Sequence, residues 1–245
     1  MSEKVERSEG GSEMYRHQTR DREFELAMGN EEGIEAIDSH IEKYVGKVET
    51  VFHEIISDLV HVDVHIVAPT PERNFYTLVT SGMSDRPMIT PPQAKGWEYA
   101  ELMICLPPTW KMTQEDFNDA ANYWPIRWLK QLSRLPHEYD TWLRASHTVP
   151  NGDPAKPFAA NTKLCCAYLS SPVLFDAGFQ ELKRSEEKIV RFFSVVPLYR
   201  EEMDWKLKHG ADSLDEKLNA IHVSELLNIN RPNACVKKFN IFGWG

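Results

Sequence analysis

Histidine and acidic side chains give this sequence two places where chemistry is conceivable. His61, Asp63 and His65 alternate with apolar residues, so in a β-strand the three polar side chains share one face. Imidazole and carboxylate groups form an acceptable ligand set for a divalent metal. Alternating polar residues are also typical of the wetter face of a half-buried strand, and no further ligand cluster accompanies them. We therefore predict no metal and no cofactor, with a metal-binding strand as the alternative.

His147 is the second candidate, at the start of a turn in which Asn151-Gly152 indicates a chain reversal. An imidazole held against Asp140 or Asp153 could act as a general base. The sequence contains neither a Gly-x-Ser-x-Gly motif nor the signature of a catalytic cysteine. We therefore predict that the protein is not an enzyme and that His147 bonds backbone or a partner. A hydrolase that uses His147 and Asp140 is the alternative.

A third site candidate lies between two apolar runs, Phe75–Val79 and Tyr99–Leu106, which fit buried strands. One interpretation is a recognition loop that exposes a methionine beside small polar residues and is held by two rigid strands. The other is a connecting loop whose methionines, Met83 and Met88, fold back onto the core. On the first interpretation, the predicted partner-binding residues are Gly82, Met83, Ser84 and Asp85.

An acidic helix is the remaining candidate surface. The segment from Leu198 onward is helical in pattern, with a break expected at Gly210, and it begins with the carboxylates of Glu201, Glu202 and Asp204. The whole chain carries a net charge of −9. This balance argues against a duplex-binding surface and fits a basic protein partner, although charged helix residues are most simply a solvated face. We therefore predict a protein partner and no nucleic acid.

The elements that position these residues indicate an α+β fold, with a mixed β-sheet covered by helices in a single domain. Residues 1–22 are polar and predict a disordered tail, and residues 23–245 form the domain. A helix is expected from Asn30 to Gly46, a short one around Phe117–Trp124, a second from Pro125 to Pro136, and a third helical segment over His137–Ala145. The other expected strands are Val48–Ile56, His61–Ala68, Thr162–Leu169 and Lys188–Pro197.

Cysteine usage and hydropathy bear on location. The four cysteines include no Cys-x-x-Cys pair, so neither a zinc site nor a redox motif is indicated. No run approaches the roughly 18 apolar residues that span a bilayer, and the first residues do not read as a signal peptide. We predict a cytoplasmic protein that does not bind membranes.

Four stretches resemble the Suppressor of fused (SUFU-like) domain family in its single-domain bacterial form, over roughly residues 45–235. They are FYTLVTSGMSDRPM followed by WEYAELMICLP; YWPIRWLKQLSRLPHEYDTWL with SHTVPNGDP; VVPLYREEMDWKLKHGADSLDEKL; and INRPNAC. The resemblance implies binding rather than catalysis, and it supplies no catalytic residues.

In animals the family member restrains a transcription factor by clamping a peptide between two domains, and this sequence lacks the length for the second. Bacterial members are interpreted as immunity proteins or antitoxins, which neutralise a toxin, often a nuclease. The resemblance thus implies an inhibitor of a basic toxin or nuclease, with an intracellular regulatory scaffold as the alternative. Neither reading fixes the oligomeric state.

Overall fold

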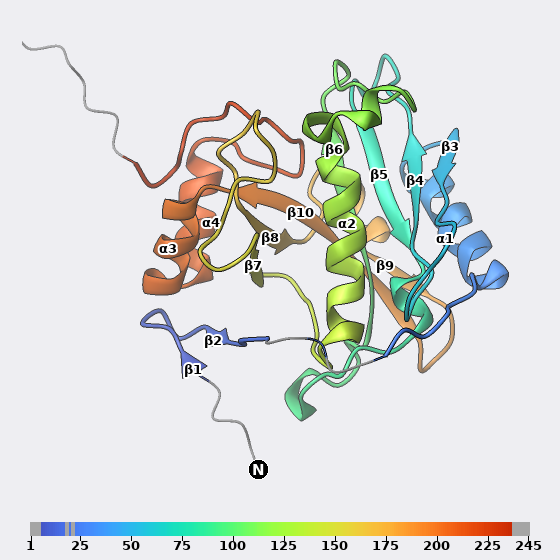
Figure 1. Cartoon of the computed structure of the whole chain (residues 1–245), viewed down its shortest axis with the longest axis horizontal. Helices are drawn as coiled ribbons and strands as arrows, with labels where there is room; N and C mark the ends of the chain where they lie inside the picture. Colours follow the sequence, from blue (N-terminus) through green and yellow to red (C-terminus); the bar gives the residue numbers. More distant parts are fainter. Residues whose placement is uncertain (1–5, 18–19, 21–22, 237–245) are drawn as a thin grey trace, which may run out of the picture.

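A mixed β-sheet runs through the centre of the molecule (Figure 1), in a computed structural model that describes residues 6–17, 20 and 23–236. Its strands follow the order β3-β4-β5-β6-β10-β8-β7, and β9 pairs with β10. Only β6 and β10 run parallel, and the other neighbours are antiparallel. The predicted α+β class is confirmed. The strands are β3 Thr50–Phe52, β4 Asp63–Val67, β5 Tyr76–Ser81, β6 Tyr99–Leu106, β7 Thr148–Pro150, β8 Cys166–Ser170, β9 Glu181–Lys183 and β10 Ile189–Leu198.

Helix α1, Glu31–Tyr44, covers one face of the sheet and confirms the helix predicted between Asn30 and Gly46. The Asn30 side chain accepts a hydrogen bond from the Gly33 amide at 3.3 Å, which caps the first turn. Ile37 and Ile41 are buried against β5, β6 and β10. The period of the apolar residues therefore fixed both the helix and its inner face.

Helix α2, Ala120–Glu138, covers the opposite face as one continuous helix. Two helices meeting at Trp124 and Pro125 had been predicted, and that division is wrong. Pro125 has no amide hydrogen for the carbonyl of Ala121 one turn earlier. The side-chain amide of Asn161 donates to that carbonyl instead, at 3.2 Å, so the helix passes through the proline without an unpaired acceptor.

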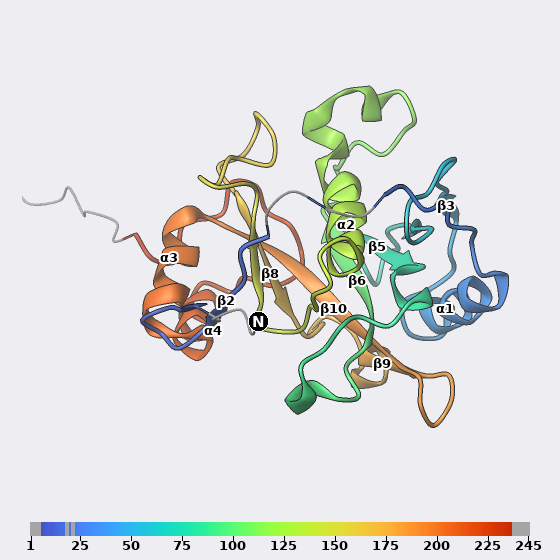
Figure 2. The same ribbon diagram turned by 60° about the horizontal axis from the view of Figure 1, so that its bottom comes forward.

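Helices α3, Arg200–His209, and α4, Ala211–Ala220, pack beside β8 and β10 at the far end of the sheet from α1 (Figure 2). Leu214 and Leu218 enter a core with Tyr168 and Leu198. The break predicted at Gly210 is confirmed, because this residue has a φ of +88° and separates the two helices.

Several loops differ from prediction. The helical segment expected over His137–Ala145 is wrong, since α2 ends at Glu138 and Asp140 adopts a φ of +49°. Trp142 and Leu143 still enter the core, as their apolar character indicated. The short strands β7 and β9 lie in segments where no strand was expected. Single 3₁₀ turns complete the described elements: η1 Met83–Asp85, η2 Pro92–Ala94, η3 Asp116–Asn118 and η4 Ala177–Gln180.

The segment before the domain includes a small hairpin of β1, Glu6–Arg7, and β2, Glu13–Met14. Its turn reaches α3, where the Gly10 amide donates to the Leu207 carbonyl at 2.8 Å. The remaining residues of the predicted tail, 1–5, 18–19 and 21–22, and the aromatic C-terminal segment 237–245 lie outside the described residues. The division at residue 22 stays a prediction. None of the described helices combines the length and apolarity needed to cross a bilayer.

Candidate partner-binding surface

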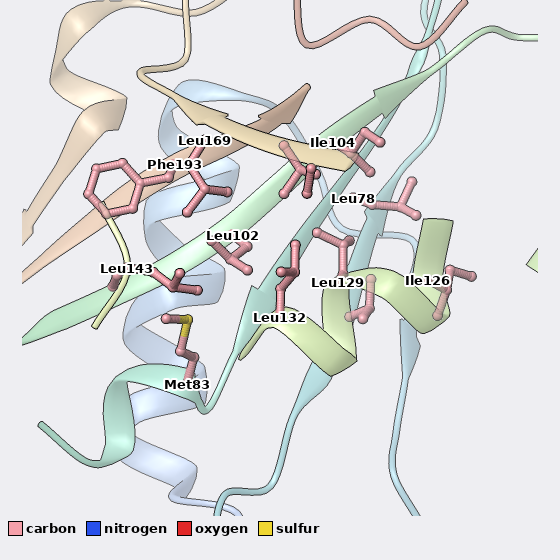
Figure 3. Close-up of a cluster of buried hydrophobic side chains, with 14 of the residues drawn as sticks. Leu78, Met83, Leu102, Ile104, Ile126, Leu129, Leu132, Leu143, Leu169 and Phe193 are labelled. Atoms are coloured by element: carbon pink, nitrogen blue, oxygen red, sulfur yellow. The ribbon is translucent and has the colours of Figure 1, made fainter. Parts of the chain in front are cut away.

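The predicted recognition loop is an internal anchor rather than an exposed loop. Met83 has none of its surface exposed and lies among Leu102, Leu132 and Leu143 (Figure 3), and Ser84 is buried as well. The second interpretation of this segment is therefore the right one: Met83 and Met88 fold back onto the core. Only Asp85 keeps partial access to solvent.

Gly82 makes this inward turn possible. Its φ is +98°, and a Cβ on it would stand 1.8 Å from the carbonyl oxygen of His61. No side chain fits in that space, so glycine is required both by the backbone conformation and by the neighbouring strand. The Ser-Gly-Met spacing, which was compatible with either interpretation, belongs to a tight turn into the core.

The turn is held by a buried carboxylate on β6. Glu101 accepts hydrogen bonds from the Ser84 amide at 2.9 Å, from Ser84 Oγ at 2.7 Å and from Thr80 Oγ1 at 2.6 Å. Burial nevertheless raises the pKa of Glu101 to about 7, against the lowering effect of these donors. Glu101 is thus a structural clamp on residues 82–85, which is a poor position for contact with another protein.

The acidic helix is only partly on the surface. Glu201 and Asp204 are exposed, but Glu202 is fully buried. Glu202 accepts two hydrogen bonds from the Arg231 guanidinium, at 2.6 and 2.5 Å, and one from the Tyr199 amide at 2.9 Å. Helical spacing places Glu202 on the inner side of α3, so its predicted exposure is wrong while that of Glu201 and Asp204 holds.

His147 is half-buried behind the edge strand β7, where its ring meets that of Trp142 edge-on at 4.9 Å. Burial, together with the nearby charges of Arg144 and Lys206, lowers its pKa to about 4. The imidazole is therefore neutral at pH 7 and a weak base. Asp153, one of its proposed acidic partners, forms an ion pair with Arg16 instead.

The His61, Asp63 and His65 set lies in a buried polar network. Asp63 is 3.1 Å from His61 Nε2, and His65 Nδ1 is 3.0 Å from Asp38 of α1. Our expectation that this is the wetter face of a strand is wrong, because Asp63 and His65 are fully buried under α1. In the part of the chain that the structure describes, no three His, Cys, Asp or Glu side chains are grouped as metal ligands.

A row of carboxylates on α1 was missed in the sequence. Glu31, Glu35, Asp38 and Glu42 recur at helical spacing, and all but the half-buried Asp38 are exposed. Among the described residues, the three exposed members have no ion-pair partner. The signal that could have identified the row is the spacing of three to four residues between its members. The row adds to the negative charge on the surface, which attracts a basic partner.

A protein-family model described as Suppressor of fused protein (SUFU) matches residues 58–232, well over half of the chain. The protein therefore belongs to the Suppressor of fused family, as the resemblance of its motifs had indicated. A comparison with curated protein sequences finds no match.

Solved structures share the fold at low sequence identity. A Suppressor of fused homologue from Neisseria gonorrhoeae has a TM-score of 0.61 at 19% identity, and the match covers 85% of this chain and 100% of that one. A Sufu–Fu complex has a TM-score of 0.57 at 13% identity, with coverages of 82% and 92%. Drosophila Suppressor of Fused has a TM-score of 0.55 at 12% identity, and this chain spans 51% of its length.

Proposed function

We propose that this protein is a cytoplasmic immunity protein or antitoxin-like inhibitor. It neutralises a basic toxin, such as a nuclease, by binding it tightly. The observation that carries the proposal is membership of the Suppressor of fused family, matched over residues 58–232. Members of this family are typically binding proteins without catalytic activity, and in bacteria they are often immunity proteins. The four free cysteines fit the reducing cytoplasm.

The charge of the molecule supports a basic partner. The chain has a net charge of −9, and exposed carboxylates lie both on α1 and at Glu201 and Asp204 of α3. A negative surface raises the rate at which a basic protein approaches, and an acidic inhibitor can occupy a groove that otherwise binds nucleic acid. We therefore assign Glu201 and Asp204 to the attraction of the partner.

Residues that the structure buries play a different part in this proposal. Gly82, Met83 and Ser84 shape the core beneath the surface, and Glu202 holds the chain around Arg231. His147 is the intermediate case, because its ring is partly accessible beside β7. Of the predicted contact residues, Glu201 and Asp204 keep exposed carboxylates, and Asp85 keeps a half-buried one.

Affinity capture from a lysate of the native cells, at low and at high salt, tests the proposal. We expect the full chain to retain a basic protein, and we expect high salt to weaken retention because salt screens exposed charges. Recovery of a non-basic regulatory protein whose retention does not depend on salt would support the scaffold alternative instead, for which the Sufu–Fu complex gives a structural precedent in the fold.

A further inference from the structure

Large apolar side chains are exposed together on two neighbouring segments near the start of α1. One segment, residues 23–30, leads into that helix, and the other, residues 53–58, is the loop between β3 and β4 (Figure 2). The exposed fractions are 62% for Phe24, 63% for Leu26, 80% for Met28, 99% for Ile55 and 73% for Ile56. We call these five residues the apolar patch.

Backbone pairing holds the two segments together. Leu26 and Asp58 form an antiparallel bridge, in which the Ala27 amide donates to the Ser57 carbonyl at 3.1 Å and the Leu59 amide to the Glu25 carbonyl at 2.9 Å. Because side chains alternate along an extended segment, Phe24, Leu26 and Met28 point to one side. The bridge brings the loop that carries Ile55 and Ile56 next to this segment.

The size of the apolar patch is that of an interface core. With roughly 200 Å² of surface for a large apolar residue, the five exposed fractions amount to roughly 750 Å². The largest apolar patch of a typical monomer is about 300–600 Å², and a standard protein interface buries about 800 Å² on each partner. The patch is therefore large enough to form the centre of a stable complex.

Buried ionic groups fix the loop that carries Ile55 and Ile56. Glu54, between the loop and the core, forms an ion pair with Arg134 of α2 and accepts a hydrogen bond from Ser57 Oγ at 2.9 Å. Asp58 is ion-paired with Arg20, and the Glu54 amide donates to Asp63 at 3.1 Å. The loop is thus anchored at both ends, so its isoleucines are presented in a fixed position and lose little entropy on binding.

The border of the patch is acidic. Residues 23–32 read EFELAMGNEE, with four glutamates and no lysine or arginine. Arg86 pairs with Glu25 and Arg184 with Glu32, whereas Glu23 and Glu31 have no ion-pair partner among the described residues. Two of the four carboxylates in the border are therefore left without an ion pair in the described part of the chain, and an apolar centre with such a border is complementary to an apolar surface with a basic border.

We propose that the apolar patch is the core of the interface with the basic partner, whose matching surface is an apolar area surrounded by lysine or arginine. This inference rests on the proposed function and locates its contact. Phe24, Leu26, Met28, Ile55 and Ile56 all lie before residue 58, where the family match begins. The partner would accordingly be selected by a part of the chain that the family model does not cover.

Photo-crosslinking from the full chain tests the location. A photoreactive phenylalanine analogue replaces Ile55, which makes almost no contact in the fold, and the matched control carries it at Val173, an exposed residue on another loop. Irradiation in the native lysate should join a basic protein at position 55 and not at 173. An adduct at 173 alone overturns the proposal, and an adduct of two copies of this chain shows that the patch is a dimer interface instead.

A binding measurement separates this inference from the proposed function. With the crosslinked protein purified, Leu26→Ser combined with Ile55→Ser should raise the dissociation rate at least tenfold and leave the thermal melting curve unchanged. If Val173→Ser gives the same loss, or if the double variant dissociates like the wild type, the patch is not the interface although the inhibitor proposal stands. Failure to crosslink any protein at position 55 contradicts the location of the interface, whereas failure of the affinity capture to retain any protein contradicts the proposed function.

Discussion

A single buried carboxylate, Glu101, ties the turn at residues 82–85 to the sheet, and its charge depends on pH within the physiological range. Its pKa rises from 4.5 in the unfolded chain to about 7 in the fold, chiefly because burial disfavours the charged form. The folded state therefore binds more protons than the unfolded state between these pH values. The contribution of Glu101 to stability is fully present below about pH 4.5 and is lost as the pH rises through about 7.

This linkage gives a measurable expectation. Each pKa unit corresponds to about 1.4 kcal/mol, so Glu101 should lower the unfolding free energy by about 3 kcal/mol between pH 4.5 and 8. Glu101→Gln, which keeps one oxygen for the two Ser84 donors and replaces the oxygen to which Thr80 donates, should remove that part of the pH dependence. Urea unfolding at several pH values measures it, with Glu42→Gln on the exposed face of α1 as the control. A variant with the wild-type pH profile would show that Glu101 is not the group responsible.

Substitution of Gly82 gives a second test at the residue scale. The cost of its positive φ can be separated from the cost of a steric collision with His61 by comparison with Gly96. Gly82 and Gly96 have similar φ values, +98° and +90°, but a Cβ at Gly96 meets no atom within 4 Å. A positive φ costs a non-glycine residue about 1–2 kcal/mol, and the collision with His61 adds about 1–3 kcal/mol. Gly82→Ala should therefore lower the unfolding free energy by about 2–5 kcal/mol, and Gly96→Ala by only about 1–2 kcal/mol. If chemical denaturation shows that the two variants lose the same unfolding free energy, the backbone moves to avoid the collision and the prediction for Gly82 is wrong.

Among the elements, α3 is joined to the segment after α4 by a buried ion pair. Arg231 donates to Glu202 and to the Pro197 carbonyl, at 2.9 Å for the latter, and the Ala234 amide donates to Glu202 at 2.8 Å. Removal of one member leaves the other charge buried without compensation, which is more costly than the pair itself is favourable.

Arg231→Ala should accordingly destabilise the protein by about 3–5 kcal/mol, which for a domain of this size lowers the melting temperature by roughly 6–20 °C. Arg200→Ala is the matched control, since Arg200 pairs with Asp204 of the same helix at 3.9 Å and both side chains are exposed. Its effect should stay below about 1 kcal/mol. Thermal melts that rank the two variants in the opposite order would contradict this assignment.

Helices and strands with a strong periodic pattern could be predicted from the sequence. The partners that bury or extend them, which are distant in the sequence, could not. The strand Tyr99–Leu106, the helix that begins after Asn30 and the break at Gly210 all follow from local residue types. The single helix α2 did not, because Asn161, which is forty residues from Ala121 in the sequence, supplies the hydrogen bond that Pro125 cannot donate to the Ala121 carbonyl. Two polar residues were misjudged for the same reason: Glu202 and His65 are buried against Arg231 and Asp38, which are distant from them in the sequence.

For the whole molecule, the proposal assigns different roles to charge and to apolar contact. Glu201 and Asp204 lie on α3, at the other end of the sheet from α1 and the apolar patch (Figure 1). At that distance their carboxylates can speed the approach of a basic partner but cannot hold it once bound. The apolar patch, by contrast, should determine how long the complex lasts.

Glu201→Lys combined with Asp204→Lys should therefore slow association several-fold at low salt and leave dissociation unchanged. The control is Glu186→Lys combined with Glu187→Lys, an equal change of charge in the exposed turn between β9 and β10. Surface plasmon resonance with the captured partner provides both rates. A faster dissociation in the α3 variant would place those carboxylates in the interface itself. If the control variant slowed association equally, the effect would come from the net charge of the molecule and not from the position of Glu201 and Asp204.

The binding surface was less predictable than the fold, because binding depends on which apolar side chains remain exposed after the chain has folded. Phe24, Leu26 and Met28 alternate with acidic or small residues, a pattern that can be read in the sequence, but their exposure follows from pairing with the loop at Ile56. Met83 shows the opposite case, since its polar neighbours indicated exposure and the turn at Gly82 buries it.

The most direct measurement is a titration of the captured basic protein with this chain while the toxic activity of that protein is followed. We expect the activity to fall linearly and to vanish at one equivalent, because an inhibitor that binds tightly acts stoichiometrically. A captured partner that stays fully active with the chain in excess would contradict the inhibitor function.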